Sequence, residues 1–123
     1  MPYQIIQEPA FFRLVFFGDI TPPDLQSLAT ELAAIEDALP VALNLLTDLN
    51  QISGRDLTFA DVFAFVERRK AQQLANAVKS AIVAPMPVQI GFSRMFQILN
   101  DHPQIEVQVF ATLAEAEAWL VSP

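Results

Sequence analysis

One junction between an apolar segment and a helix start carries the side chains best placed for chemistry. Residues 48–65 read DLNQISGRDLTFADVFAF, and Ser53, Asp56 and Thr58 bring two hydroxyls and a carboxylate into this short polar stretch. Hydroxyls and a carboxylate crowded at a helix start form either a working site or the cap of the helix. These three residues are therefore the candidate site of this stretch.

Thr58 has a second interpretation, as the N-cap of the helix that follows. A threonine oxygen at this position accepts a hydrogen bond from a free backbone N–H of the first helical turn, and Asp61 stands at the third helical position. Phosphate on Thr58 would be stabilised by the positive end of the helix and by Arg55, whereas Asp61 would repel it. The cap accounts for both residues, so we expect a cap and keep the switch as the alternative.

Other catalytic and ligand-binding patterns are missing from the sequence. His102 is the only histidine, there is no cysteine, and no G-x-S-x-G motif supplies a nucleophilic serine. The three glycines are too scattered to form a phosphate-binding loop, and no calcium-loop spacing occurs. We expect no catalytic residue, no metal and no cofactor, and hence no enzyme. His102 is expected at a helix end, and the run 68–70 (Arg-Arg-Lys) on a solvated helix face.

Length and composition narrow the class of protein. The 123 residues are expected to form a single domain, 1–123, with a net charge of -7 that disfavours binding to nucleic acid or anionic lipid. The longest apolar run, 81–88, is far shorter than the roughly 20 residues of a membrane-spanning helix, so no stable membrane insertion is expected. Without cysteines or a recognisable secretory signal, the expected location is cytoplasmic.

Short β-favouring runs alternate with segments of helical periodicity. Strands are expected at 3–7, 11–17, 41–49, 78–84 and 105–109. Helices are expected to begin near Thr21, Thr58, Val88 and Thr112. The expected inward stripes of the first three helices are Leu25, Leu28, Leu32 and Ile35; Phe59, Val62, Phe63 and Val66; and Val88, Phe92, Met95 and Leu99.

This order, ββαβαβαβα, predicts an α/β fold with a mixed, mostly parallel five-stranded sheet and about four helices. Residues 11–17 are apolar at both odd and even positions, so both faces of this strand should be covered. We therefore expect 11–17 and 41–49 inside the sheet, with the helices that begin at Thr21 and Thr58 packed on it.

The opening hairpin, the hydroxyl-bearing loop after the third strand and the ending QIEVQVFATLAEAEAWL together resemble the STAS superfamily in its SpoIIAA-like branch. In the anti-sigma-factor antagonists of that superfamily, this loop reads Asp-Ser-Ser/Thr-Gly and a partner kinase phosphorylates the second hydroxyl. Asp56 and Thr58 match that pattern, whereas Leu57 and Phe59 depart from it. The resemblance therefore implies that Ser53, Asp56 and Thr58 form a candidate phospho-acceptor or partner loop. The SpoIIAA-like branch is also similar in fold to the CRAL-TRIO lipid-transfer domains.

A surplus of apolar residues lies outside the expected helical stripes. Phe17, Phe65, Met86 and Ile90 are the candidates for an apolar interface or pocket. They could be ordinary core, the interface of a homodimer or the lining of a site for a nonpolar ligand.

The resemblance implies a non-enzymatic cytosolic regulatory or protein-interaction module, with a homodimer expected. It would act through residues 53–61 on a protein partner such as a kinase or an anti-sigma-like factor. The alternative, implied by the likeness to CRAL-TRIO domains, is a carrier or sensor of a small nonpolar ligand.

Overall fold

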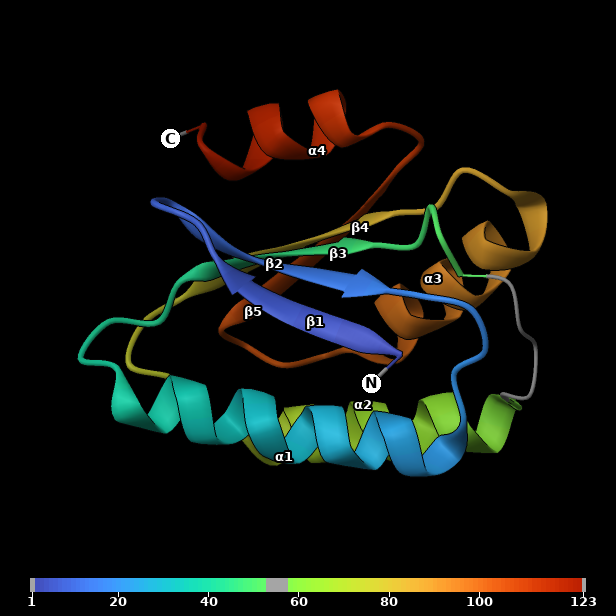
Figure 1. The fold of residues 1–123 in the computed structure, drawn as a ribbon. Coiled ribbons are helices and arrows are strands. Elements are labelled where there is room, and N and C mark those ends of the chain that lie inside the picture. Colours follow the sequence, from blue (N-terminus) through green and yellow to red (C-terminus); the bar gives the residue numbers. More distant parts are fainter. Residues whose placement is uncertain (1, 53–57, 123) are drawn as a thin grey trace.

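The computed structural model describes residues 2–52 and 58–122. Five strands form one sheet in the order β1-β2-β3-β4-β5 (Figure 1). The strands are β1 (Tyr3–Gln7), β2 (Phe11–Phe16), β3 (Asn44–Asp48), β4 (Val78–Val83) and β5 (Ile105–Phe110). The helices are α1 (Pro22–Ala38), α2 (Phe59–Ala71), α3 (Pro87–Leu99) and α4 (Leu113–Leu120).

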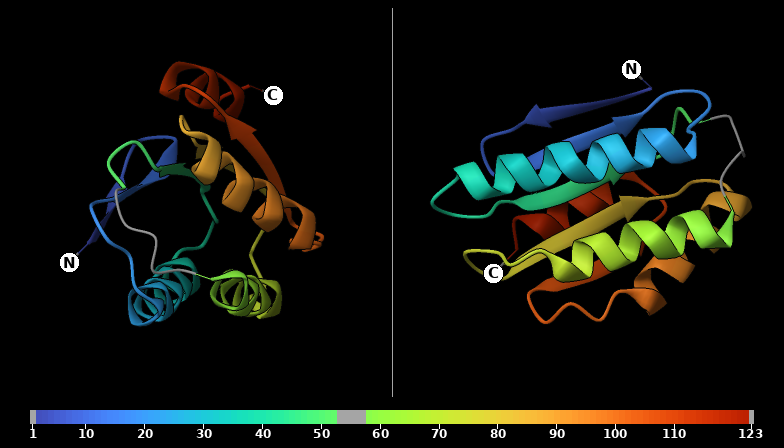
Figure 2. Two further views of the ribbon diagram at one scale, coloured as in Figure 1. Left: turned by 90° about the vertical axis from the view of Figure 1, so that its right-hand side faces the viewer. Right: turned by 90° about the horizontal axis from the view of Figure 1, so that it is seen from below.

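The sheet combines one antiparallel pair with three parallel ones. β1 runs antiparallel to β2, with Tyr3 opposite Phe16, and the pairs β2–β3, β3–β4 and β4–β5 are parallel. Each parallel connection contains one helix, as a crossover between parallel strands requires. α1, α2 and α3 lie on one side of the sheet and α4 on the other (Figure 2). The expected fold class is therefore confirmed, including the interior position of β2.

Apolar side chains fill both sides of the sheet. On the α4 side, the central residue Leu46 is fully buried in a cluster that also contains Leu120 of α4. On the opposite side, Leu14 and Phe16 of β2 pack in a cluster with Leu28 of α1. Because alternate residues of a strand point to opposite faces, β2 contributes to both clusters, which explains its continuous apolar sequence.

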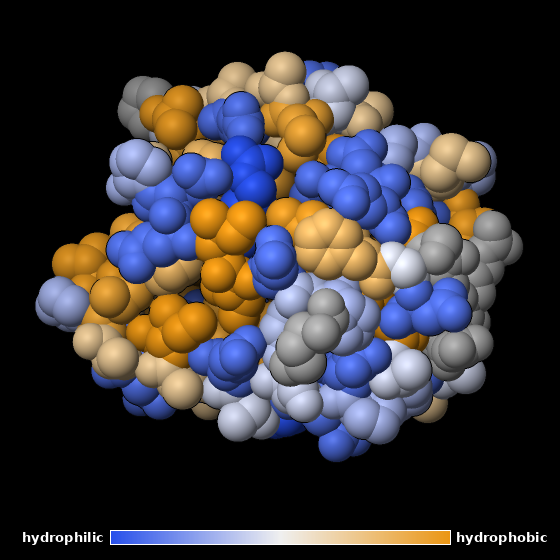
Figure 3. Space-filling model, viewed as in Figure 1, coloured by the Kyte–Doolittle hydropathy of each residue, from blue (hydrophilic) through white to orange (hydrophobic). Residues whose placement is uncertain are grey.

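The edge strand β1 leaves apolar atoms at the molecular surface. Apolar residues reach the surface in the band between α1 and α4, over this edge of the sheet (Figure 3). Ile6 of β1 is among the exposed large hydrophobic residues. No helix in the described part of the chain is both long and apolar enough to cross a membrane.

The third strand and the second helix differ in detail from the sequence predictions. The strand expected at 41–49 is shorter, because Val41 is exposed and Ala42 binds Asn76 outside the sheet. Phe63 was predicted to face inward, but it is 43% exposed. The inward stripe of α2 continues from Val66 to Arg69, so the stripe turns away from Phe63.

The third helix also turns differently from its predicted orientation. Val88 was expected to face inward, yet it is 42% exposed. Ser93 is buried instead, and Ser93, Phe96 and Asn100 follow the spacing of one helical face. Two of these three residues are polar, which is why hydrophobic periodicity placed the inward face elsewhere.

Candidate functional site

The carboxyl edge of the parallel strands is where the candidate loop is attached. β2, β3, β4 and β5 all end at this edge, and each of the helices α1 to α4 begins there (Figure 1). In open α/β sheets, ligands commonly bind outside the carboxyl ends of the strands. The topology therefore places the loop after β3 in the region where this class of fold commonly carries function.

The base of the loop after β3 is held by hydrogen bonds from three directions. The Asp48 carboxylate accepts from the backbone N–H of Asn50 at 2.9 Å and from its side chain at 2.7 Å. Gln89 of α3 donates its side-chain amide to the Leu49 carbonyl at 3.0 Å. Gly18, whose φ of 58° favours glycine, donates its N–H to the Gln51 carbonyl at 3.0 Å. The chain therefore leaves the sheet in a fixed direction as far as Ile52.

Thr58 forms the predicted cap of α2. Its backbone N–H and its hydroxyl both donate to one carboxylate oxygen of Asp61, at 2.7 and 3.0 Å. In return, the Thr58 oxygen accepts from the Asp61 backbone N–H at 3.4 Å. This is a reciprocal capping box, and both of its hydrogen-bonded groups are exposed. The cap is confirmed, and it already engages the hydroxyl that a kinase would modify.

Ser53 and Asp56, the other two members of the candidate loop, lie outside the described residues. The structure therefore fixes the two ends of this segment, at Ile52 and Thr58, and says nothing of the contacts of Ser53 and Asp56. Their role as a partner loop stays a prediction.

The four apolar candidates occupy different environments. Met86, immediately before α3, is 58% exposed, and its backbone N–H donates to the Gln89 side chain at 3.1 Å. Phe17 and Ile90 are half-buried near the same carboxyl edge. Phe65 instead packs inside, where its ring lies 5.9 Å from that of Phe96, centroid to centroid. The four residues therefore do not form one surface.

Phe65 lines a cavity between the sheet and the three helices α1, α2 and α3. The cavity measures about 130 Å³, and its wall is mostly apolar. Polar side chains also line it, among them Arg69, Ser93 and Asn100. The sequence named Phe65 as a candidate pocket residue, but it did not predict the place of the cavity or the rest of its lining, because these depend on how three helices meet.

Arg69, which was expected on a solvated face, is buried and ion-paired. One guanidinium nitrogen lies 2.6 Å from a carboxylate oxygen of Glu36 on α1, and a second nitrogen donates to the other oxygen at 3.3 Å. Both side chains are 7% exposed. Such a two-point contact has the geometry in which arginine binds carboxylates most strongly. The partners are 33 positions apart, so sequence spacing gave no signal for the pair.

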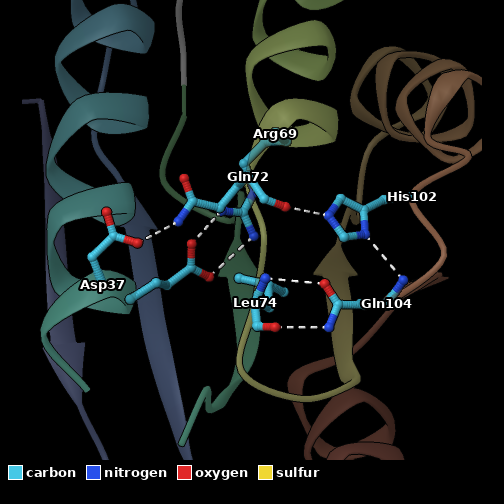
Figure 4. A network of polar contacts seen from close by, with 7 residues as sticks. Asp37, Arg69, Gln72, Leu74, His102 and Gln104 are labelled. Carbon is cyan, nitrogen blue, oxygen red and sulfur yellow. Dashed lines mark hydrogen bonds and ion pairs between the residues drawn. The ribbon is translucent and has the colours of Figure 1, made fainter. Parts of the chain in front are cut away.

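His102 is buried and belongs to a polar network that ties α2 to the segment before β5 (Figure 4). Its Nε2 lies 2.5 Å from the Gln72 carbonyl, and its Nδ1 accepts from the Gln104 N–H at 3.0 Å. These partners select the imidazole with its proton on Nε2. Gln72 also donates to Asp37 of α1 at 3.0 Å. His102 therefore joins two segments, a contact that its place near a helix end did not predict.

Comparison with known proteins agrees with this architecture. An uncharacterized protein with a SpoIIAA-like fold from Shewanella loihica PV-4 has a similar structure, with a TM-score of 0.63 at 15% sequence identity over 96% of this chain and 91% of that one. Comparison with curated proteins gave no significant match. The SpoIIAA-like family model matches residues 11–121, which is most of the chain. The chain belongs to the SpoIIAA-like family.

Proposed function

We propose that the protein is a non-enzymatic regulatory module that binds a protein partner at the carboxyl edge of its sheet. Membership of the SpoIIAA-like family supports a regulatory or interaction role of this general type. The partner surface would consist of the loop from Ser53 to Thr58, the start of α2 and the exposed start of α3. A cytoplasmic location and a kinase or anti-sigma-like partner belong to the same proposal.

The observation that carries this proposal is the exposure of apolar residues beside an anchored loop. Met86 and Val88 are both exposed at the start of α3. From the same turn, Gln89 binds the Leu49 carbonyl and so links α3 to the base of the loop. Exposed apolar side chains next to a hydrogen-bonded loop base give a partner both contact area and hydrogen-bonding groups.

The site offers two ways to regulate such binding. If Thr58 is only a cap, the exposed apolar residues would carry the contact and Thr58 would set the position of α2. If Thr58 is a switch, a phosphate there would replace the hydroxyl that now binds Asp61 and would place negative charge against its carboxylate. The engaged hydroxyl favours the cap, because modification would first have to break the capping box.

Photo-crosslinking in the native cells tests the proposed surface. A photoreactive amino acid at Met86 should give adducts with one protein partner. The same residue at Val41 or Val121, which are equally exposed but lie at the opposite end of the sheet and after α4, should give none. Equal adducts at all three positions, or none at Met86, would contradict the proposal.

The same partner then distinguishes the cap from the switch. If Thr58 is a cap, Thr58→Asp should leave partner affinity unchanged; aspartate is also a good N-cap, but it cannot donate to the Asp61 carboxylate and adds a like charge beside it, so a small loss of stability is expected. If Thr58 is a switch, Thr58→Asp should change the affinity at least tenfold, or about 1.4 kcal/mol. Phosphothreonine at position 58 in protein from native cells would favour the switch.

A homodimer remains part of the proposal, with Phe17, Met86 and Ile90 as its candidate contacts. Phe65, the fourth candidate, is half-buried, packs against Phe96 and lines the cavity, so it lies apart from these three. Sedimentation velocity at micromolar concentration measures the oligomeric state: a monomer gives one chain mass and a homodimer gives two.

A carrier of a small nonpolar ligand is the second candidate function. The cavity of about 130 Å³ supports a ligand of limited size. Sites for drug-sized molecules measure roughly 300–1,000 Å³, so an acyl chain would require α1, α2 and α3 to move away from the sheet. Uptake of a fluorescent fatty acid by the purified protein would favour the carrier, and its absence would favour the interaction module.

A further inference from the structure

The cavity between the sheet and α1, α2 and α3 has a size and lining that suit one small molecule. Its volume is about 130 Å³, close to the ~150 Å³ of an engineered apolar cavity that stays dry and binds benzene or xenon. The wall is built mainly of leucine and phenylalanine side chains from three helices and two strands, including Leu28, Leu45, Phe65, Phe92 and Phe96. An aromatic ring in this cavity would gain close contacts with the surrounding apolar side chains.

Two buried polar atoms on the wall lack hydrogen-bond partners. These are the Ser93 hydroxyl oxygen and the Asn100 side-chain oxygen, and neither has a partner within the part of the chain that the structure describes. Ser93 is only 3% exposed. Buried polar groups are almost always hydrogen-bonded in native proteins, so two unpaired atoms in the lining of one cavity point to a missing partner.

The orientation of Asn100 specifies what that partner must offer. Its amide nitrogen donates to the Ile105 carbonyl at 3.3 Å. Reversing the amide would bring its oxygen against that carbonyl, so the free oxygen stays an acceptor. A ligand that pairs with Asn100 must therefore carry an O–H or N–H donor. Ser93 lies two helical turns away on the same face of α3, and its hydroxyl can pair with either a donor or an acceptor.

The charges around the cavity exclude an ionised ligand. Arg69 is the cationic side chain of the lining, and Glu36 holds its guanidinium at two points. Its charge is therefore already neutralised and gives no counterion to a carboxylate. Burying an unpaired ion is far more costly than burying a neutral polar group. The site is suited to an uncharged molecule.

We propose that this cavity binds a small, uncharged, mainly apolar molecule of about the size of one aromatic ring that carries a hydroxyl or N–H donor. The donor pairs with the Asn100 oxygen, and the ring packs among the leucine and phenylalanine side chains. A phenol or a small aromatic alcohol has this chemistry. The inference rests on the second candidate function, because it names the ligand class of the same cavity, and it is independent of the proposed partner surface. Fatty-acid uptake without phenol binding would support the carrier and overturn this inference.

Three probes of similar shape test the proposal with the whole chain. Phenol, toluene and benzoate are titrated at neutral pH while the methyl resonances of Leu28 and Leu45 are followed by NMR. Phenol should shift these resonances with an affinity at least fivefold above that of toluene, which lacks the donor, and benzoate should give no shift. Equal affinities for phenol and toluene would overturn the role of Asn100. No binding by any probe at millimolar concentration would overturn the proposed ligand site.

Two variants place the binding in this cavity. Val62→Phe fills the cavity and should reduce phenol affinity at least tenfold, whereas Val121→Phe, the same change at an exposed position, should leave the affinity unchanged. Asn100→Leu should bring the phenol-to-toluene affinity ratio close to one. If either variant fails to fold, the probe comparison on the unaltered protein still decides the proposal. Unchanged phenol binding by a folded Val62→Phe protein would overturn it.

Discussion

Helix α2 begins at an exposed capping box and ends beside a buried ion pair. At its start, Thr58 and Asp61 exchange three hydrogen bonds at the surface. At its end, Arg69 pairs with Glu36 where both side chains are 7% exposed, and the Gln72 carbonyl accepts from His102. The same helix is therefore held by surface contacts at the carboxyl edge of the sheet and by buried contacts at the opposite end.

The two ends differ in what a substitution should change. Exposed polar contacts are weakened by water and salt and contribute little to stability, whereas removing one partner of a buried pair leaves a charge without solvation. The start of α2 can thus vary in sequence, or carry a modification, while the helix stays anchored at its other end. This arrangement suits a partner-binding surface at the carboxyl edge.

The largest expected effect is at the buried ion pair. Arg69→Met leaves the Glu36 carboxylate buried without its partner and should lower the free energy of unfolding by about 3–5 kcal/mol. Arg68→Met is the matched control on the same helix, because Arg68 is exposed and donates to the Gln26 carbonyl and the Thr30 hydroxyl. Its cost should stay within about 1 kcal/mol. Urea denaturation measures both.

A double variant separates the charge from the packing. Arg69→Met combined with Glu36→Leu removes both charges and should recover most of the stability lost in the single variant, since apolar replacement of a buried pair is often neutral. If Arg69→Met costs no more than Arg68→Met, the two ends of α2 are not held differently and the comparison fails.

An intermediate effect is expected at His102. His102→Phe keeps the ring volume but removes the hydrogen bonds to the Gln72 carbonyl and the Gln104 N–H. It should lower the free energy of unfolding by about 1–3 kcal/mol, the usual cost of leaving buried groups unpaired. His102→Asn can still accept from Gln104 and should cost less. Thermal unfolding compares the three proteins, and equal stability would show that the two hydrogen bonds of His102 do not stabilise the fold.

Local sequence signals predicted the exposed end of α2 but not its buried end. The cap at Thr58 depends on residues three positions apart, so the sequence contains the full signal. The contact of Arg69 with Glu36 and that of His102 with Gln72 join residues 33 and 30 positions apart. Their charges and polarity suggested exposure, because isolated charged residues are usually at the surface. The packing of α1 against α2 brings the first pair together, and the packing of the end of α2 against the segment before β5 brings the second pair together.

Contacts between residues far apart in the sequence also explain why most of the cavity was not predicted. The fold class followed from alternating strand and helix patterns, which are properties of neighbouring residues. The inward face of α3 contains Ser93 and Asn100, and a polar residue on a buried face cannot be recognised from hydrophobic periodicity. The sequence therefore named only Phe65 among the residues of the candidate ligand site and the structure supplied the others, whereas the candidate partner loop came from the sequence.

The smallest expected effect is at the capping box of α1, which has the same hydrogen bonds as that of α2. The Asp24 carboxylate accepts from the Thr21 N–H at 2.9 Å and from the Thr21 hydroxyl at 2.7 Å. These two hydrogen bonds hold the pKa of Asp24 below its ordinary value of 3.8, and the bond from the backbone N–H has the larger effect. Because the folded pKa is lowered, this carboxylate stabilises the fold above pH 3.8 and loses that contribution as the pH falls through the folded pKa.

Asp24→Asn should therefore lower the free energy of unfolding at pH 7 by up to about 1 kcal/mol, with the exposed position reducing the effect, and the difference from the unaltered protein should disappear in acid. Asp61→Asn makes the matched change in the fully exposed box of α2 and should cost less than Asp24→Asn, since the α1 box is partly buried. Urea denaturation from neutral to acid pH compares the two variants. A larger loss at Asp61 would mean that the start of α2 is itself a stabilising contact, and a surface needed for folding would be poorly suited to a modification switch.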